Sequence, residues 1–467
     1  MHDLSSTTSD LRQSSTSYTS ITASTLMTKS DLFDLHLGTG ASLYASINSL
    51  LLSTNAELVL VTCFWAPSRS LDILSSTLRE LSNKALERDP TGKLKIRVRI
   101  CLSSLSLWQK LFQPQKRFGH VYPPEQWEKT LGLPSPQNLT GLDLEVRCKF
   151  FLPLSVMHPK FIMIDDQTVV LPSCNVSWED WFEGGVTLRG DVVNHFRGFW
   201  ERHWDGELTL PKQVASVRKV SVMEPLQHHS QSALPQHITL DLESIDTVFL
   251  ESDYHVNPRF MPFPWQSPPA PPRTPLNTFL LSLFRTVEKR IYIQTPNVTA
   301  MPVLNAIVDM LRRGIDVHIV TSERLMILEQ VVTAGTTTFK CMQELIKRYR
   351  DVRIATQLQS PTQERLMEEG HVRLPGRLVI EYYQPVEDRS QTTAACAEPV
   401  QSHLKLTIAD DELTILGSGN MDRASWYTSQ ELGVAFFSPS LATTLRNTLE
   451  DVLRHRKRLL FDSNKNS

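Results

Sequence analysis

Two stretches of this sequence repeat the same reactive side chains at the same spacing. Residues 158–165 read HPKFIMID and residues 403–410 read HLKLTIAD, so each contains His-x-Lys-x-x-x-x-Asp. An imidazole can attack an electrophile or move a proton near neutral pH, and an ammonium group can hold an anion. Two imidazoles beside two ammonium groups suit in-line displacement at phosphorus. The candidate catalytic residues are His158, Lys160, Asp165, His403, Lys405 and Asp410.

The shared register continues beyond each motif. A serine and an asparagine follow 15 and 17 residues after each histidine, and a Glu-x-Gly-Val sequence comes further on, three residues nearer its histidine in the first copy. Lysine and asparagine side chains can donate hydrogen bonds to the non-bridging oxygens of a phosphate. We therefore assign substrate binding to Ser173, Asn175, Glu183, Ser418, Asn420 and Glu431.

Local structure explains why these residues would meet. Positions two apart on a strand project from the same face, so the histidine and lysine of one motif point together. Residues 165–167 (DDQ) and 410–412 (DDE) are turn-forming, which predicts a hairpin in each copy. The return strands, 169–171 and 413–416, bring the serine and asparagine back beside the starting histidine and lysine. Two such halves packed face to face would supply two complete sets.

The elements around the motifs alternate between strands and helices, which predicts an α/β fold. We expect strands over residues 57–63, 94–100 and 142–151, and helices over 41–52 and 71–86. The same order restarts with helices over 276–289 and 301–313 and strands over 290–294 and 315–320. A helix over 325–348 is expected to break near Gly335. Two halves with one order indicate an internal duplication.

The domain boundaries follow from composition. Residues 1–30 are mostly Ser and Thr and are predicted to be a disordered tail. Residues 31–210 and 276–467 form the two lobes, and residues 211–275 form a linker with a proline-rich end. Residues 385–401 are predicted to be an exposed loop.

Composition narrows the class of protein. The 467 residues carry 48 Lys+Arg against 50 Asp+Glu, so no overall positive charge favours nucleic acid or an anionic membrane. The six cysteines have neither metal-ligand nor disulfide-scaffold spacing, which suits a reducing compartment. No apolar run reaches the roughly 18–20 residues that span a bilayer, and no signal peptide is evident. We expect an intracellular protein, cytoplasmic or peripheral on a membrane, without a metal or cofactor.

A third match to the motif shows how weak one copy is. Residues 455–462 read HRKRLLFD, but they come at the end of an expected helix and no residues remain for the later serine and asparagine. We interpret them as a basic helix end. The other two matches share their register over 17 residues and follow strands, which makes coincidence a poor explanation.

The paired motif resembles the phospholipase D superfamily, whose members carry two His-x-Lys-x-x-x-x-Asp motifs. Residues 417–420 (GSGN) are close to the family pattern, whereas the first copy has PSCN at residues 172–175. The resemblance implies two similar α/β sandwich lobes, each a mixed sheet flanked by helices, with one site at their interface. It also implies phosphodiester chemistry through a phosphohistidine and without a metal, in a phospholipase D-like or cardiolipin-synthase-like protein. Members transfer phosphatidyl groups to water or alcohols, or cut nucleic acids.

We therefore expect a phosphodiesterase that hydrolyses or transfers a phosphatidyl group, with a phospholipid as substrate. His158 is the expected nucleophile and His403 the expected general acid, although the pseudo-symmetry leaves the opposite assignment open. Asp165 and Asp410 would support the hairpins or orient the histidines. A nuclease using the same site and a silent lipid- or phosphate-binding protein are the alternatives. No partner protein is needed to complete the site, because one chain carries both motifs.

Three aromatic residues close behind the first motif have two interpretations. Trp178, Trp181 and Phe182 could shape a substrate pocket, but packing in the core is the favoured interpretation. Phe260, Phe263 and Trp265 in the proline-rich stretch are interpreted as anchors of a long loop rather than as a lipid-contacting lip.

Overall fold

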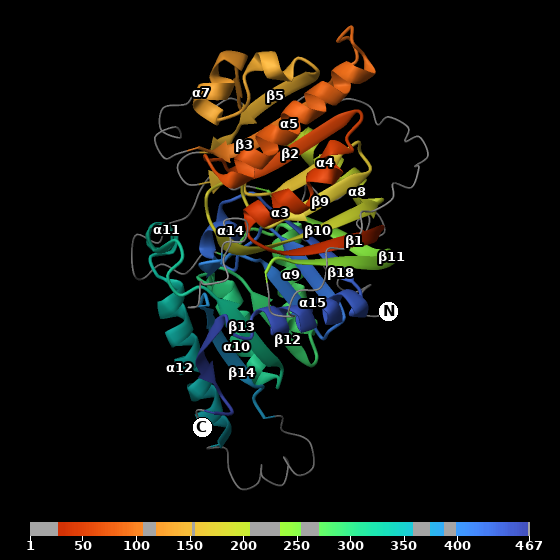
Figure 1. Ribbon diagram of the computed structural model, residues 1–467. Helices are drawn as coiled ribbons and strands as arrows, with labels where there is room; N and C mark the ends of the chain where they lie inside the picture. The colour runs from red at the N-terminus through yellow and green to blue at the C-terminus, as the bar shows by residue number, and fades with distance from the viewer. Residues whose placement is uncertain are drawn as a thin grey trace.

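The chain folds into two α/β lobes that share one large sheet (Figure 1). The computed structural model describes residues 27–105, 118–151, 155–205, 234–253, 270–357, 374–386 and 398–465. Within this part of the chain, 17 strands belong to the large sheet and two more form a small hairpin. The mixed α/β class predicted from the sequence is confirmed.

The N-terminal lobe alternates strands and helices up to its last helical turns. Its strands are β1 (Met27–Gly38), β2 (Glu57–Phe64), β3 (Ile96–Ser104), β4 (His120–Tyr122), β5 (Leu142–Cys148), β6 (Phe150–Phe151), β7 (Ser155–Val156), β8 (Phe161–Ile164), β9 (Thr168–Pro172) and β10 (Trp181–Gly190). Its helices are α3 (Gly40–Ser46), α4 (Asn48–Leu52), α5 (Arg69–Arg88), α7 (Trp127–Leu131) and α8 (Val192–Trp200), with short turns η1 (Pro124–Gln126), η2 (Pro136–Leu139) and η3 (Glu201–Asp205).

A long strand, β11 (Gln236–Ser252), leads to the C-terminal lobe. The strands of this lobe are β12 (Arg290–Gln294), β13 (Asp316–Thr321), β14 (Leu378–Tyr383), β15 (Gln401–Ser402), β16 (Leu406–Ala409), β17 (Leu413–Gly417), β18 (Glu431–Phe437) and β19 (Lys457–Asp462). Its helices are α9 (Pro275–Thr286), α10 (Met301–Arg312), α11 (Ile327–Ala334), α12 (Thr338–Gln357), α14 (Arg423–Tyr427) and α15 (Pro439–Val452).

The two lobes repeat one arrangement of strands. In the N-terminal lobe β2 pairs with parallel β3 and antiparallel β8, and β8, β9 and β10 follow as antiparallel neighbours. In the C-terminal lobe β12 pairs with parallel β13 and antiparallel β16, and β16, β17 and β18 follow in the same way. A helix comes after the last strand of each set, α8 after β10 and α15 after β18. The sequence thus predicted the repeated order correctly.

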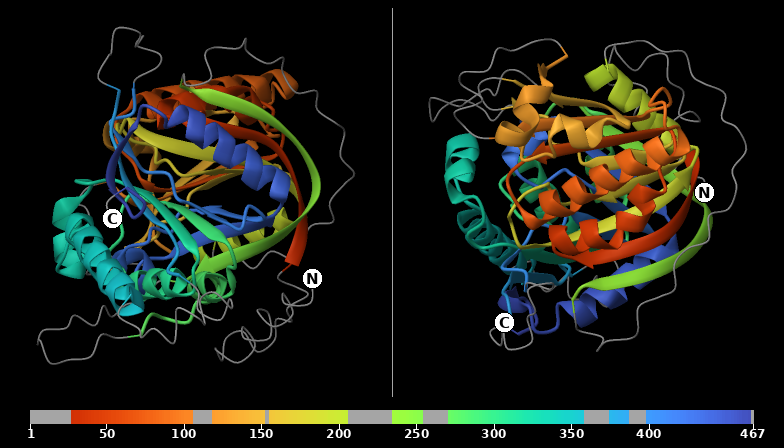
Figure 2. Two further views of the ribbon diagram at one scale, coloured as in Figure 1. Left: turned by 90° about the horizontal axis from the view of Figure 1, so that it is seen from below. Right: turned by 45° about the horizontal axis from the view of Figure 1, so that its top comes forward.

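Two long strands join the lobes. β1 pairs with β10 on one side and β11 on the other, and β11 continues the sheet into β18. Figure 2 shows β1 and β11 as long curved ribbons lying side by side. β11 falls in the segment 211–275 that the sequence predicts as a linker, so residues 236–252 are strand instead. Alternating residues of this strand, such as Ile238, Leu240 and Leu242, pack against the core, a pattern that the polar surroundings obscured.

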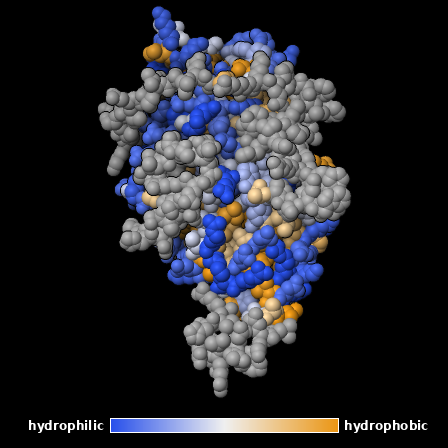
Figure 3. Space-filling model, turned by 180° about the vertical axis from the view of Figure 1, so that it is seen from behind, coloured by the Kyte–Doolittle hydropathy of each residue, from blue (hydrophilic) through white to orange (hydrophobic). Residues whose placement is uncertain are grey.

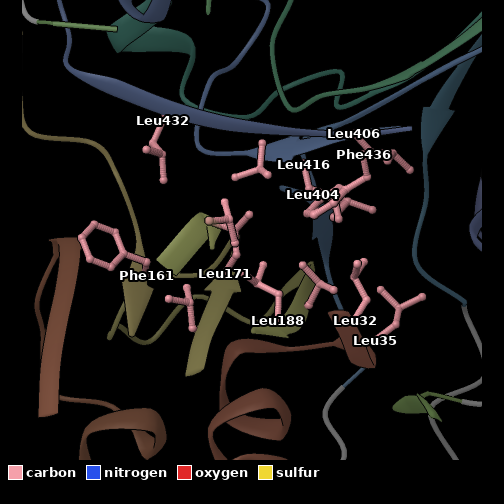
Figure 4. Close-up of a cluster of buried hydrophobic side chains, with 14 of the residues drawn as sticks. Leu32, Leu35, Phe161, Leu171, Leu188, Leu404, Leu406, Leu416, Leu432 and Phe436 are labelled. Carbon is pink, nitrogen blue, oxygen red and sulfur yellow. The ribbon is translucent and has the colours of Figure 1, made fainter. Parts of the chain in front are cut away.

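The largest core lies between the lobes. Alternate residues of the strands face inward, and Phe161, Leu171 and Leu188 of the first lobe meet Leu404 and Leu416 of the second (Figure 4). Separate cores lie under the outer helices of each lobe. The inter-lobe core also takes one face of α8 and one face of α15. Apolar burial on this scale holds the two halves in one fixed relation.

The remaining expectations have mixed outcomes. Gly335 adopts a left-handed conformation and separates α11 from α12, which confirms the predicted break. Residues 27–30 of the predicted tail belong to β1, and the proline-rich aromatic residues at 260–265 lie outside the described residues. His455 lies exposed in the turn after α15 rather than on the helix.

Among the described helices, none is long and apolar enough to cross a membrane. Figure 3 shows a largely hydrophilic face, with hydrophobic side chains gathered over the C-terminal lobe.

The aspartates of the two motifs hold the hairpins against neighbouring strands. The Asp410 carboxylate accepts hydrogen bonds from the backbone N–H groups of residues 288, 289 and 290, at 2.8–3.0 Å, where β12 begins. Asp165 does the same for residues 55–57 at the start of β2. Both aspartates have positive φ angles, 52° and 51°, which the tight turns require. Both carboxylates are thus committed to backbone N–H groups, which is the arrangement expected if these two residues support the hairpins, one of the two roles that the sequence left open for them.

Replacement of Asp410 tests this structural role. We expect D410A to lower the free energy of unfolding by about 2–3 kcal/mol, because three N–H groups lose a charged acceptor and alanine disfavours positive φ. D410N should cost less, since asparagine tolerates this conformation and keeps one acceptor. Urea unfolding measures both. A D410A protein of normal stability whose turnover has fallen a thousandfold would instead make Asp410 a catalytic group.

Candidate active site

Both motif segments are extended stretches that run into a hairpin. His158 and Lys160 immediately precede β8, and His403 and Lys405 lie between β15 and β16. The hairpins β8–β9 and β16–β17 form as predicted, with turns at residues 165–167 and 410–412. The histidines and lysines stand just outside the strands, so backbone pairing from elsewhere must fix them.

That backbone pairing comes from the opposite lobe. The His158 N–H donates to the carbonyl of Gln430 at 3.0 Å, and the His403 N–H donates to the carbonyl of Phe182 at 2.8 Å. Gln430 and Phe182 each stand directly before the glutamate that follows a motif in their own lobe. Each histidine is thus held beside a glutamate that lies 273 or 220 residues away in the sequence.

The side chains of the two histidines also bind to residues of the opposite lobe. His158 Nδ1 lies 2.8 Å from Glu431 Oε2, and His403 Nδ1 lies 2.7 Å from Glu183 Oε1. A carboxylate at Nδ1 favours the tautomer with its proton on Nδ1 and leaves Nε2 for chemistry. Glu183 and Glu431 are almost fully buried behind the histidines. The sequence assigns both glutamates to substrate binding, and in the structure each carboxylate faces an imidazole of the other lobe.

The serines of the motifs hold these glutamates rather than facing open space. Ser173 donates to Glu183, and Ser418 donates to Glu431 Oε2 at 2.5 Å. Ser425 of α14 donates to the other oxygen of Glu431 at 2.6 Å. Each serine oxygen also accepts from the backbone N–H that follows its glutamate. Serine, glutamate and the histidine of the other lobe therefore form a connected chain in each half.

The lysines lie buried against their own histidines. Lys160 Nζ donates to the His158 carbonyl at 2.9 Å, and Lys405 Nζ donates to the His403 carbonyl at 2.7 Å. Lys405 Nζ also lies 2.8 Å from both ring nitrogens of His403. The expectation that histidine and lysine point together is thus met in the second copy.

The two asparagines have different surroundings. Asn175 Oδ1 accepts from the backbone N–H of Phe64 at 3.2 Å, at the end of β2. Asn420 Nδ2 donates to Asp422 at 3.0 Å, and its buried Oδ1 has no hydrogen-bond partner among the described residues. A buried amide oxygen that accepts no hydrogen bond is unusual, and it is available to accept one from a ligand.

Burial controls the ionisation of both imidazoles. It lowers the pKa of His403 to about 3, although Glu183 opposes the change, and Lys405 lowers it further. Burial also lowers the pKa of His158, and Glu431 partly offsets this. The His158 side chain keeps 14% of its surface exposed, against 3% for His403. Both rings are therefore biased toward the neutral form, and His403 more strongly.

The pKa values of Lys405, Glu183 and Glu431, which lie around the histidines, are also shifted. Burial lowers the pKa of Lys405 to about 7, even though Glu183 and Glu431 favour its charged form. Burial alone would raise the pKa of each glutamate, but the facing histidine and the donated hydrogen bonds lower it overall. The site thus contains two ionised carboxylates, which can stabilise an imidazolium that forms during a reaction.

The first copy has Cys174 where the second copy has Gly419, and the packing around these two positions differs. A Cβ at Gly419 would lie 3.1 Å from Leu276 of α9, which leaves little room for a side chain there. The equivalent position in the first copy is Cys174, which packs against Gly40 at the start of α3. Cys174 is buried. The two positions therefore pack against different helices, α9 for Gly419 and α3 for Cys174.

The three aromatic residues behind the first motif have three different surroundings. Trp181 lies over His403, with ring centroids 4.6 Å apart, while Phe182 is buried in the core and Trp178 is 65% exposed. Ser425 and the carbonyl of Gln430 gave no sequence signal, because their roles depend on packing between distant segments. Across the described residues, no group of three or more His, Cys, Asp or Glu is placed to hold a metal ion.

Comparisons with known proteins show which proteins the chain is similar to. Residues 280–453 match the family model "Cardiolipin synthase, PLD-like domain". The fold is similar to the phosphatidylserine synthase of Haemophilus influenzae, with 13% identity, a TM-score of 0.52, and coverage of 98% of this chain and 92% of that one. The phospholipase D family member Nuc of Salmonella typhimurium aligns with 19% identity and a TM-score of 0.27, over 40% of this chain and 90% of that one. No curated protein sequence matches the chain.

Substitution of Glu431 tests whether a glutamate of one lobe serves the histidine of the other. We expect E431Q to lower turnover about 100-fold and to shift the limb of the pH–rate profile that belongs to His158 toward lower pH. The shift has this sign because Glu431 raises the pKa of His158, so its removal lowers that pKa. The matched control is E412Q, an exposed glutamate in the second hairpin turn. An unshifted profile in E431Q would contradict the pairing.

Proposed function

We propose, because this chain belongs to the phospholipase D superfamily, that it hydrolyses or transfers the phosphatidyl group of a phospholipid. The superfamily assignment sets the class of chemistry, a phosphodiesterase or phosphatidyltransferase. The substrate and the roles of individual residues are the proposal, and they rest on the chain's own geometry and charge.

One observation carries the proposal. Two imidazoles from opposite lobes are each bonded through Nδ1 to a buried glutamate, at 2.8 and 2.7 Å, and each has a buried lysine beside it. Two imidazoles beside two cations match a reaction in which one group attacks phosphorus and the other serves the leaving oxygen. A purely structural role is a poor account of this set, because burying so many ionisable groups is costly.

The electrostatics favours His403 as the nucleophile and His158 as the acid, the assignment that the sequence left open. His403 is the more buried ring and the more strongly held neutral, as an attacking nitrogen must be. In the first step the bond from His403 Nε2 to phosphorus forms while the bond to the headgroup oxygen breaks. His158 enters this step as the imidazolium, keeps its Nδ1 proton hydrogen-bonded to Glu431 and donates its Nε2 proton to that oxygen, which leaves the ring neutral. His158 is the more exposed ring, so it can recover a proton from solvent.

In the second step His158 acts as a general base instead of a general acid. Its neutral Nε2 takes a proton from water or from an acceptor alcohol, whose oxygen attacks phosphorus. The bond between phosphorus and His403 Nε2 breaks, and the product is a phosphatidic acid or a new phosphatidyl ester. Glu431 stabilises the imidazolium of His158 each time it forms.

The groups that hold the phosphate are the two lysines and the two asparagines. Lys160 and Lys405 neutralise the oxygens, and a bound anion favours the charged form of Lys405, whose pKa is near 7. Asn420 has an unpartnered oxygen that can accept from a hydroxyl of the substrate. Asn175 contributes from the opposite lobe.

The net charge of the chain favours a lipid over a nucleic acid as the substrate. Proteins that hold a polyphosphate chain usually carry a basic excess, whereas this chain has a formal net charge of −2. The matching family model is described as a cardiolipin synthase type, which also points to phosphatidyl chemistry. The nuclease alternative uses the same site and differs only in substrate.

A substrate panel separates the two. With phosphatidylglycerol or phosphatidylcholine and a primary alcohol, we expect phosphatidic acid and a phosphatidyl alcohol, with the alcohol product rising at the expense of the acid. Chelator should leave the rate within about twofold, because lysines and asparagines rather than a metal hold the phosphate. H403N and H158N should each lower the rate by at least about 1,000-fold.

The matched control for the histidines is H455A, which alters the third copy of the motif and should stay within about threefold of the parent. Cleavage of single- or double-stranded nucleic acid with no turnover of any phospholipid would contradict the proposed substrate. Turnover that disappears in chelator and returns only with a divalent ion would contradict the metal-free mechanism.

A further inference from the structure

Helix α11 presents its apolar side to water and its polar side to the protein. Ile327, Leu328, Val331 and Val332 are 44%, 76%, 48% and 49% exposed, although all four are aliphatic. At 3.6 residues per turn they cover an arc of about 140° on one side of the helix. Gln330, on the other side, is only 3% exposed. This is the reverse of the usual pattern for a helix at the surface of a globular protein.

The buried polar side holds α11 firmly. Gln330 Nε2 donates to the carbonyl of Leu325 at 2.6 Å, and Gln330 Oε1 accepts from the backbone N–H and the hydroxyl of Thr338 at 2.5 and 2.9 Å. Left-handed residues, Met326 and Gly335, bound the helix on both sides. The exposed aliphatic arc is therefore a fixed feature of the fold and not a frayed segment.

Helix α11 is linked to segments that belong to the active site. The Arg423 side chain of α14, which follows Asn420, donates to the carbonyl of Thr333 in α11 at 3.0 Å. Figure 1 shows α11 at one edge of the molecule, level with α14. The segment before α11 also touches the second motif, because Ser322 donates to the carbonyl of Ser402, next to His403, at 2.8 Å.

A second exposed apolar side chain stands on the other lobe at the same site. Trp178 is 65% exposed and belongs to the segment that leads to Trp181, which covers His403. Asp180 in this segment accepts from the backbone N–H of Val400, itself 42% exposed, at 2.8 Å. Exposed apolar side chains thus stand in both lobes, on segments that are close in sequence to residues in contact with His403 or next to it.

Size and charge decide which occupant fits. An arc of four aliphatic side chains is on the order of a few hundred Å², well below the roughly 800 Å² per partner of a stable protein pair. Arg324 and Lys340 are exposed near the two ends of α11, and Glu329 lies at the edge of the arc. Aliphatic side chains flanked by basic ones, with an exposed tryptophan, match the interface of a phospholipid bilayer.

We infer that α11 and Trp178 dock on the surface of a phospholipid bilayer and bring the paired histidines to the headgroups. This inference rests on the proposed phospholipid substrate and adds the surface by which the enzyme reaches it. A lipid in a bilayer cannot diffuse to a buried site, so the protein must approach the headgroup layer with the site facing it.

Vesicle flotation of the full chain tests the docking surface without requiring turnover. With vesicles of phosphatidylcholine and phosphatidylglycerol, we expect the double variant L328S/V332S to bind roughly tenfold more weakly than the parent. W178S should also weaken binding severalfold. The matched control is L94S, whose leucine is 65% exposed but lies in the loop before β3. L94S should bind within twofold of the parent.

Two results would overturn the inference. The first is parent protein that fails to float with these vesicles, or a double variant that floats as well as the parent. The second is light scattering that shows a parent dimer dissociated by L328S/V332S, which would make the arc an interface with a second copy. Equal urea midpoints for parent and variants confirm that folding is unchanged. Turnover of soluble bis(4-nitrophenyl) phosphate should stay within twofold in the variants, and loss of that activity in the parent would count against the proposed function instead.

Discussion

Each histidine of the site depends on a glutamate that belongs to the other lobe. This exchange, His158 with Glu431 and His403 with Glu183, works only if the lobes keep one relative position to within a fraction of an ångström. The structure meets that demand in two ways. β1 and β11 carry a single sheet through both lobes, and the largest apolar core fills the space between them. The two similar lobes therefore assemble one site between them.

The same burial that fixes the site also sets its chemistry. Removing the lysines, glutamates and histidines from water is unfavourable, and it moves the pKa values of His403 and Lys405 to about 3 and about 7. The proposed function uses this balance. In the proposed reaction a bound phosphate anion supplies the missing charge, and the more strongly neutral imidazole is the one that attacks phosphorus.

Much of the fold could be predicted because its signals are local. The hairpins follow from short, mainly apolar strands on either side of an Asp-Asp turn, and the repeated order follows from two such segments with equal spacing. The roles of Glu183 and Glu431 could not be read in this way, because they depend on backbone pairing between segments more than 200 residues apart. The sequence left two roles open for Asp165 and Asp410, hairpin support or histidine orientation, because their partners are backbone N–H groups that any residue supplies. β11 was missed because its surroundings are polar, and the inverted helix α11 was predicted as a helix without its orientation.

A rapid-quench experiment tests the central claim that two imidazoles of opposite lobes act in sequence. Labelled phospholipid is mixed with the enzyme, the reaction is stopped in base, and the peptides are mapped. The account predicts a phosphohistidine at His403, which accumulates when H158N removes the proton for the leaving group and the substrate has a good leaving group. Label on His158 would exchange the two roles. Absence of label from both histidines, together with inversion at a chiral phosphorus, would contradict the account.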